Sequence, residues 1–140
     1  MPSIGKKYRE IEVGQHFVDS IVVTDQMVRD FARVTGDSNP MHLDDAFAAT
    51  TVFRRRVAHG MLTASLISRC IGIGFPGPGT IYLQQQLKFI RPVFIGDTIT
   101  VQLEVVEKIE EKKAIRLSTT CIGRKGEIVL TGDALILPPT

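Results

Sequence analysis

The spacing of apolar residues along the chain has first the period of a strand and then that of a helix. Residues 15–23 form a β-like run. After this run, apolar residues recur at the spacing of one helix face, at Met27, Val28, Phe31 and Val34. Thr24 is a residue type that caps the start of a helix, and Gly36 is one that ends it. A short helical turn is predicted over residues 44–49, inside a long irregular stretch.

Residues 61–73 carry a second helical pattern, which is apolar on nearly every side and has Arg69 as its only charge. A helix of this composition is buried over most of its surface. From residue 81 the period falls to two, in runs over residues 81–89, 98–105, 115–121 and 127–137. In the first of these runs we predict one covered face, made by Ile81, Leu83, Leu87 and Phe89.

The order of these elements, one strand, then helices, then four strands, is typical of an α+β protein. Turn-forming residues at positions 96–97 and 123–126 separate the later strands, as expected of an antiparallel meander. A sheet wrapped around the helix at residues 61–73 would cover that helix on all sides, as its composition demands. The chain has 140 residues and shows no repeat or linker, so we expect residues 1–140 to form a single domain.

Composition and charge exclude several classes of protein. Hydrophobic residues make up 44% of the chain and charged residues 23%, which is typical of a folded domain and not of a disordered binder. The 17 basic and 15 acidic residues leave a net charge of only +2. Aromatic residues are scarce, tryptophan is absent, and the only tight basic run is Arg54 to Arg56. We therefore expect no nucleic-acid partner.

The cysteines and the first residues bear on the compartment. Cys70 and Cys121 lie far apart in the sequence, so their spacing matches neither a CxxC redox pair nor a cysteine-based zinc site. The charged first residues lack the apolar segment of a signal peptide. No apolar run approaches the roughly 20 residues that a membrane span needs. These features predict a cytoplasmic protein without a membrane partner.

Polar residues that could carry chemistry are concentrated in residues 35–42 and 59–61. Asp37 and His42 flank an Asn-Pro turn, which can bring a carboxylate and an imidazole to the same side of a loop. Such a pair can move protons to and from one water molecule. The alternative is structural, because a helix stop followed by an Asx turn also gives this pattern.

His59 and Gly60 stand at the start of the buried helix. The free backbone N–H groups of Gly60 and Met61, together with the helix dipole, would stabilise a carbonyl that becomes an oxyanion. Asp37, His42 and His59 could also be the ligands of a metal site with two histidines and one carboxylate. No HxH or HExxH spacing supports that site, and we expect no metal.

Two interpretations of the basic residues are also open. Arg54 to Arg56 can be a solvated charge run. They can also hold phosphate groups of a carrier, together with Lys88 or Arg91.

Several of these motifs resemble the MaoC-like (R)-specific enoyl-CoA hydratases, of the type that feeds polyhydroxyalkanoate synthesis. The similarity covers residues 14–137, and the segment from Phe31 to His42, followed by Ala48, matches the hydratase signature. The other matching segments are Phe47–Thr51, His59–Leu62, Ile81–Tyr82 and Arg91–Asp97. Met41 departs from the pattern, in which leucine, isoleucine or valine is usual.

The resemblance implies a role for each matching residue. Asp37 and His42 would be the catalytic pair, oriented by Asn39, and the Gly60 N–H would bind the thioester carbonyl. Ser68 would be a polar residue near the site, or only a small residue that allows close packing. Substrate-binding residues would include His59, Arg54, Arg56, Lys88 and Arg91, with Ile71 and Leu135 at the far end of the acyl tunnel.

The implied fold is the α+β hot-dog fold, an antiparallel five-stranded sheet wrapped around a central helix. The implied activity is syn hydration of trans-2-enoyl-CoA to (R)-3-hydroxyacyl-CoA, without a metal or redox cofactor, by a homodimer with acyl-CoA near its interface. A hot-dog acyl-CoA thioesterase and a non-catalytic domain that binds acyl thioesters are the alternatives. Chain-length preference, and whether CoA or acyl carrier protein carries the substrate, stay open.

Overall fold

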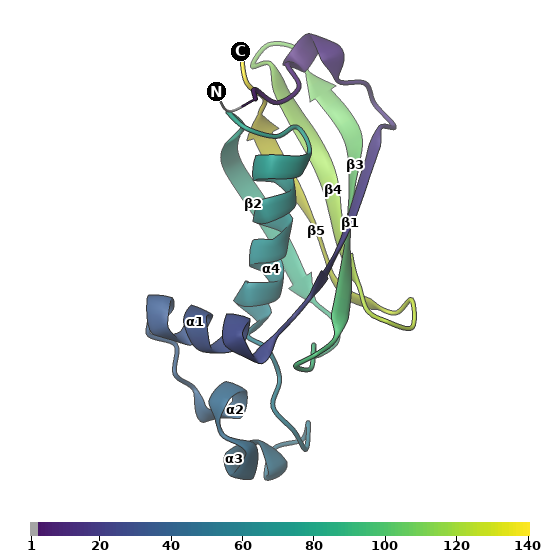
Figure 1. Ribbon diagram of the computed structural model, residues 1–140. Helices are drawn as coiled ribbons and strands as arrows, with labels where there is room; N and C mark the ends of the chain where they lie inside the picture. Colours follow the sequence, from purple (N-terminus) through teal and green to yellow (C-terminus); the bar gives the residue numbers. More distant parts are fainter. Residues whose placement is uncertain (1–2) are drawn as a thin grey trace.

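The computed structural model describes residues 3–140 (Figure 1). The chain begins with a 3-10 turn, η1 (Tyr8–Glu10), and the first strand, β1 (His16–Val22). Four helices follow: α1 (Asp25–Thr35), α2 (Pro40–Leu43), α3 (Asp45–Ala49) and α4 (Gly60–Arg69). The π-helical turn η2 (Cys70–Gly74) extends α4. The remaining strands are β2 (Ile81–Phe89), β3 (Thr98–Ile109), β4 (Ala114–Ile122) and β5 (Ile128–Leu137).

The five strands form one antiparallel sheet in the order β1-β3-β4-β5-β2, so β1 and β2 are its edges. Figure 1 shows α4 lying along the curved sheet, with α1, α2 and α3 gathered at the end of the molecule where α4 begins. This is the predicted hot-dog arrangement, and the predicted α+β class is confirmed. Within residues 3–140 no helix is long and apolar enough to cross a membrane.

The core lies between α4 and the inner face of the sheet. Every second residue is buried from Ile99 to Val105 of β3 and from Ile115 to Cys121 of β4, as the alternation predicts: Ile99, Val101, Leu103 and Val105, then Ile115, Leu117, Thr119 and Cys121. Helix α4 adds Leu62, Leu66 and Ile67, and these side chains belong to one cluster of buried residues. The predicted burial of the second helix is therefore correct, and the packed helix is a rigid support for the residues at its start.

Strand β2 departs from the prediction. Its pairing with β5 shifts between Tyr82 and Gln84, which leaves Leu83 as the unpaired residue of a bulge. A bulge reverses which residues face the core. Tyr82 and Leu87 are partly covered, whereas Ile81, Leu83 and Phe89 are 57%, 48% and 52% exposed. The prediction that Ile81, Leu83, Leu87 and Phe89 share one covered face is therefore wrong.

Helix α1 begins and ends where the sequence indicates. The Thr24 side chain accepts a hydrogen bond from the Met27 N–H at 3.1 Å, and Gly36 adopts the left-handed conformation, with φ 80°, that ends the helix. The buried residues of the helix are Val28 and Ala32, while Val34 is 73% exposed. The covered face is thus narrower than predicted, and the helix delivers the chain at Gly36 to the end of the molecule where α4 starts.

Candidate active site

Two hydrogen bonds from backbone N–H groups to side-chain oxygens shape the segment between the end of α1 and His42. The Asn39 N–H donates to Oδ1 of Asp37 at 3.3 Å, and the Met41 N–H donates to Oδ1 of Asn39 at 3.1 Å. Asn39 is thereby the N-cap of α2, and Pro40 is its first residue. The Asx turn considered above is present, and the same turn sets His42 on α2 beside Asp37.

His42 is buried, with 8% of its surface exposed. Its Nδ1 lies 2.7 Å from the carbonyl oxygen of Val57. Because a carbonyl can only accept, Nδ1 carries the proton, and in the neutral ring Nε2 keeps a lone pair. Burial lowers the pKa of His42; the Val57 carbonyl opposes this shift, nearby His59 adds to it and Asp37 opposes it. The lowered pKa favours the neutral imidazole at neutral pH.

His59 is the N-cap residue of α4 and is almost fully buried. Its ring lies against that of His42, with ring centroids 3.8 Å apart. Its Nε2 is 3.0 Å from the main-chain carbonyl of Asp37, to which it must donate. His59 therefore ties the start of α4 to the turn that holds Asp37 and packs against His42.

Asp37, His42 and His59 are also the residues that could hold a metal ion. One donor atom of each lies within 4.8 Å of the others. One nitrogen of each ring is already hydrogen-bonded to a backbone carbonyl, so only Nε2 of His42 and Nδ1 of His59 are free to bind a cation. Nδ1 of His59 is buried and has no hydrogen-bond partner among residues 3–140. The absence of a metal remains a prediction.

A pocket of about 330 Å³ opens beside His42. Gly60, the first residue of α4, lies on its wall opposite apolar side chains, among them Met41, Phe53, Phe89 and Pro92. A Cβ atom at Gly60 would come within 2.9 Å of the Phe89 ring, so a side chain at this position would displace that ring. The pocket thus combines an imidazole, the start of a helix and a mostly apolar lining.

The predicted phosphate-binding arginines lie in different surroundings. The Arg56 side chain is only 10% exposed, and its guanidinium contacts Oδ1 of Asp25 at 2.5 Å and the carbonyl of His42 at 2.7 Å. Its hydrogen bond is the main cause of the lowered pKa of Asp25. Arg56 is thus occupied in holding α1 and α2 together, which disagrees with its expected role. Arg54 is exposed, with a φ of 68°.

Four more predicted residues do not lie around the pocket. Lys88 and Ser68 are exposed, and Ser68 follows Gly60 by more than two turns of helix. Leu135 alternates with the buried Ala134 and Ile136, which puts it on the outer face of the sheet. Ile71 is buried in the core beneath the inner face. The structure therefore does not bring Ile71 and Leu135 together at one tunnel end.

Arg91 lines the pocket and donates from Nη1 to the carbonyl of Ile128 at 2.7 Å.

Two features of the site were missed in the sequence. The carbonyl of Val57, which fixes the tautomer of His42, is a backbone group with no signature of its own. Thr63 is buried one turn after His59, and its hydroxyl has no hydrogen-bond partner among residues 3–140. Thr63 is one of three hydroxyl-bearing residues of α4, with Ser65 and Ser68, and only the packing of the helix shows that it is the buried one.

The family profile described as a MaoC like domain matches residues 7–124, which include every residue of the pocket. The chain belongs to the MaoC-like domain family. Among the relatives of this MaoC-like chain is the (R)-specific enoyl-CoA hydratase of Aeromonas caviae. The two are 44% identical over 131 residues, covering 94% of this chain and 98% of the relative.

Two further relatives extend the comparison. The 3-hydroxybutyryl-CoA dehydratase of Methylorubrum extorquens is 44% identical to this MaoC-like chain over 133 residues, covering 94% of the chain and 83% of the relative. The solved structure of an R-hydratase from Pseudomonas aeruginosa has a TM-score of 0.92 at 46% identity, covering 96% of this chain and 86% of that one. Family and fold are thus shared with hydratases over nearly the whole length.

Proposed function

We propose that this chain is an (R)-specific enoyl-CoA hydratase, a hydro-lyase that adds water reversibly to trans-2-enoyl-CoA and forms (R)-3-hydroxyacyl-CoA. The observation that carries the proposal is the pairing of Asp37 with the buried His42, which lines a pocket whose wall also includes Gly60. This arrangement offers proton acceptors on one side and a helix start on the other. The similarity to named hydratases over nearly the whole chain supports the same activity.

Asp37 and His42 are the proposed catalytic pair. The carboxylate of Asp37 and the Nε2 lone pair of His42 are two acceptors, and together they can hold one water molecule. The water oxygen bonds to C3 of the enoyl group while the pair accepts the proton that the water loses. A proton from the pair then goes to C2 on the same face, which gives syn addition. Asn39 orients the pair through the two hydrogen bonds described above.

Gly60 is the proposed binding site for the thioester carbonyl. At the first position of α4, its N–H has no carbonyl partner within the helix. As water adds to C3, negative charge moves to the carbonyl oxygen, where this N–H and the helix dipole stabilise it. His59 is a positioning residue, because it acts through the rings and backbone that it contacts.

Adding the purified chain to crotonyl-CoA tests the function. We expect the absorbance of the enoyl thioester to disappear without release of free thiol, and the product to be the (R)-3-hydroxy isomer. EDTA is expected to leave the rate unchanged, since no step uses a metal. Free thiol from crotonyl-CoA or butyryl-CoA would support the thioesterase alternative, and binding without turnover would support a non-catalytic domain.

The lowered pKa of His42 predicts the acid limb of the pH profile. The neutral imidazole is the active form in this mechanism, and protonation of Nε2 removes the lone pair that holds the water. Because burial lowers the pKa of His42 from its usual 6.5, the midpoint of the acid limb of kcat/KM should lie below pH 6.5. A profile of kcat/KM between pH 4.5 and 8 measures it. A limb centred above 6.5 would contradict this assignment.

A homodimer is the proposed assembly, with β2 as the edge where two sheets join. Edge strands with exposed apolar side chains and unpaired backbone groups favour pairing with another chain. Ile81, Leu83, Phe89 and Ile90 are exposed along this edge, and Phe89 also lines the pocket. A dimer formed there would bring the acyl-CoA site close to the interface.

Substituting Leu83 by lysine is expected to weaken the dimer. A charge at the joined edges would be desolvated without a partner, so the mass by light scattering should fall toward that of one chain. Val18→Lys, at an exposed position on the other edge strand, is the matched control and should leave the mass unchanged. A single-chain mass for the unsubstituted protein at all concentrations would contradict the proposed dimer.

We also propose one domain over residues 1–140 and a cytoplasmic location. The single cluster of buried apolar residues supports the first, and the two free, buried cysteines, Cys70 and Cys121, support the second. A part in polyhydroxyalkanoate synthesis stays a prediction from the resemblance.

A further inference from the structure

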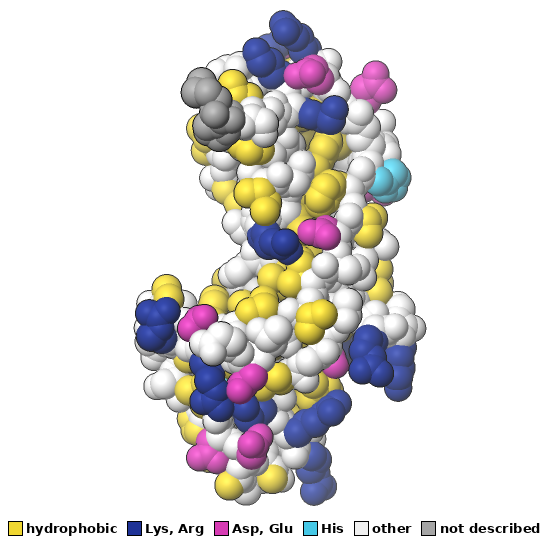
Figure 2. All heavy atoms as spheres, in the orientation of Figure 1, with side chains coloured by type: hydrophobic (Ala, Val, Ile, Leu, Met, Phe, Trp, Pro, Cys, Tyr) yellow, Lys and Arg dark blue, Asp and Glu magenta, His cyan; other side chains and the backbone are white. Residues whose placement is uncertain are grey.

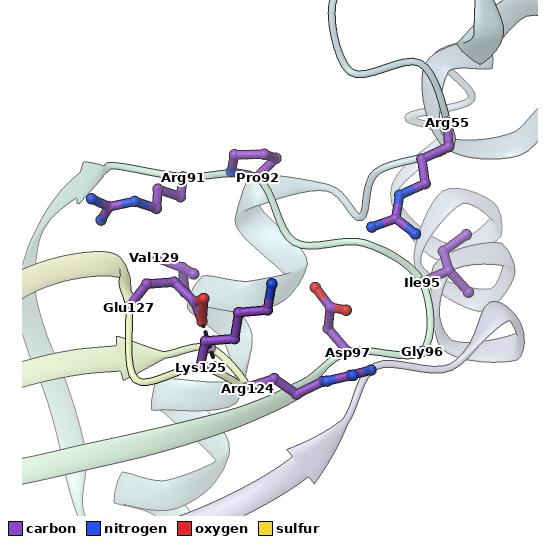
Figure 3. A pocket seen from close by; sticks show the side chains of 11 residues that line it. Arg55, Arg91, Pro92, Ile95, Gly96, Asp97, Arg124, Lys125, Glu127 and Val129 are labelled. Atoms are coloured by element: carbon purple, nitrogen blue, oxygen red, sulfur yellow. Dashed lines mark hydrogen bonds between the residues drawn. The ribbon is translucent and has the colours of Figure 1, made fainter.

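A second cavity, of about 520 Å³, adjoins the candidate active site. Three segments that are far apart in the sequence enclose it: the loop before α4, the connection between β2 and β3, and the turn between β4 and β5 (Figure 3). Arg91 and Pro92 line both this cavity and the pocket of His42 and Gly60. The two hollows are therefore neighbours that share one wall.

The lining of this cavity is mainly positive. It includes four cations, Arg55, Arg91, Arg124 and Lys125, and two carboxylates, Asp97 and Glu127, which leaves two positive charges in excess. Figure 2 shows Lys and Arg side chains over the end of the β4–β5 hairpin and again beside α3. Cations gathered around a concave surface raise the local concentration of anions.

Both carboxylates accept hydrogen bonds from backbone N–H groups. Oδ2 of Asp97 accepts from the Phe94 N–H at 3.0 Å, and Oε1 of Glu127 accepts from the Lys125 N–H at 3.1 Å. Neither forms an ion pair with the cations of the cavity within residues 3–140. The two acidic residues therefore shape the turns and leave the cations without an ion-pair partner among the described residues.

The cations differ in how they are held. The Arg55 guanidinium stacks over the Phe94 ring, 3.8 Å from its centroid, and Arg91 donates to the Ile128 carbonyl. Figure 3 shows the ends of Arg55 and Lys125 directed toward the space between the three segments, while the end of Arg91 points away. The side chains of Arg124 and Lys125 have no hydrogen-bond or ion-pair partner in the described part of the chain. Arg55, Arg124 and Lys125 are thus free to bind an anion.

We propose that this cavity binds the phosphate groups of coenzyme A, with Arg55, Arg124 and Lys125 as the binding residues. The proposal rests on the proposed function, which puts the thioester carbonyl at Gly60 in the neighbouring pocket. The pantetheine arm would then pass along the shared wall at Arg91 and Pro92. One guanidinium group can donate to two phosphate oxygens at once, and a lysine contributes a single positive charge. Arg54 and Arg56 do not line the cavity.

Kinetics with two thioesters test the proposal. The double substitution Arg124→Gln, Lys125→Gln is compared with the unsubstituted chain on crotonyl-CoA and on crotonyl-pantetheine, which has no phosphate. We expect the KM for crotonyl-CoA to rise by roughly tenfold, because two exposed charge-assisted contacts are lost. The kcat for both substrates and the KM for crotonyl-pantetheine should stay unchanged.

Lys112→Gln, Lys113→Gln is the matched control, since it removes the same charge at the β3–β4 turn, outside both cavities. It should leave both KM values unchanged. An unchanged KM for crotonyl-CoA in the Arg124, Lys125 variant overturns the proposal, whatever that variant does to a thioester on acyl carrier protein. An equal rise for crotonyl-pantetheine also overturns it, because the effect would then not depend on phosphate.

Titration calorimetry separates this proposal from the proposed function. With free CoA and free pantetheine as ligands, the unsubstituted chain should bind CoA more tightly, and the Arg124, Lys125 variant should lose that difference. If no thioester is hydrated, the proposed function fails, but this binding difference still supports the phosphate site. If hydration proceeds and the two ligands bind equally, the phosphate site fails alone.

Discussion

Replacing Asp37 by asparagine is expected to lower kcat/KM for crotonyl-CoA by about 10²- to 10⁴-fold, the usual contribution of a general acid or base. Asparagine has the same shape, and its amide oxygen can still accept the hydrogen bond from the Asn39 N–H. It cannot take a proton from water at neutral pH. The variant therefore separates proton transfer from the structure of the turn.

Asp30→Asn is the control for this substitution. Asp30 is an exposed carboxylate on α1, the helix that ends just before Asp37, and it takes no part in the pocket. We expect its activity to equal that of the unsubstituted chain. Thermal unfolding should show both variants folded. Full activity in Asp37→Asn would show that Asp37 takes no part in catalysis and would favour a purely structural role for the turn.

Substituting His42 by asparagine should reduce kcat/KM over a similar range, about 10²- to 10⁴-fold. The asparagine amide nitrogen can replace Nδ1 as the donor to the Val57 carbonyl, so the buried acceptor keeps its partner. The Nε2 lone pair is lost, and with it the second acceptor for the water. Steady-state rates with crotonyl-CoA measure the effect.

His16→Asn, at an exposed position on β1, is the matched control and should leave the rate unchanged. The double variant of Asp37 and His42 adds a sharper test. If both residues hold one water, the combined loss should be much smaller than the product of the two single losses, because residues that act as a unit are not additive. A fully multiplicative loss would indicate two separate steps.

The parts of the fold that depend on local pattern could be predicted from the sequence. The capping of α1 by Thr24 and its end at Gly36 are decided by groups within a few residues. The buried positions of β3 and β4 follow from strict alternation, because one face of each strand packs on α4. The pairing of Asp37 with His42 belongs to the same class, since the Asn39-Pro40 turn sets it locally.

The remaining features depend on contacts between distant segments. The bulge at Leu83 arises from the pairing with β5, and nothing in the alternation of β2 marks it. In the sequence Arg56 is one of three basic neighbours, but in the structure Asp25 of α1 fixes its side chain. The sequence predicts only a turn between β4 and β5. In the structure the cations of this turn line the same cavity as Arg55, which comes from a distant segment.

His59 and Gly60 are consecutive residues, and this has a consequence for which double bond can react. His59 holds the turn that carries Asp37, and Gly60 is the proposed donor to the carbonyl, so in the proposed mechanism one peptide link sets the spacing between the two. The packed helix behind them leaves this spacing little freedom to change. Only a carbon at one fixed number of bonds from the carbonyl then meets the water. We expect an isomer with its double bond one carbon further along the acyl chain to bind in the pocket and stay unhydrated.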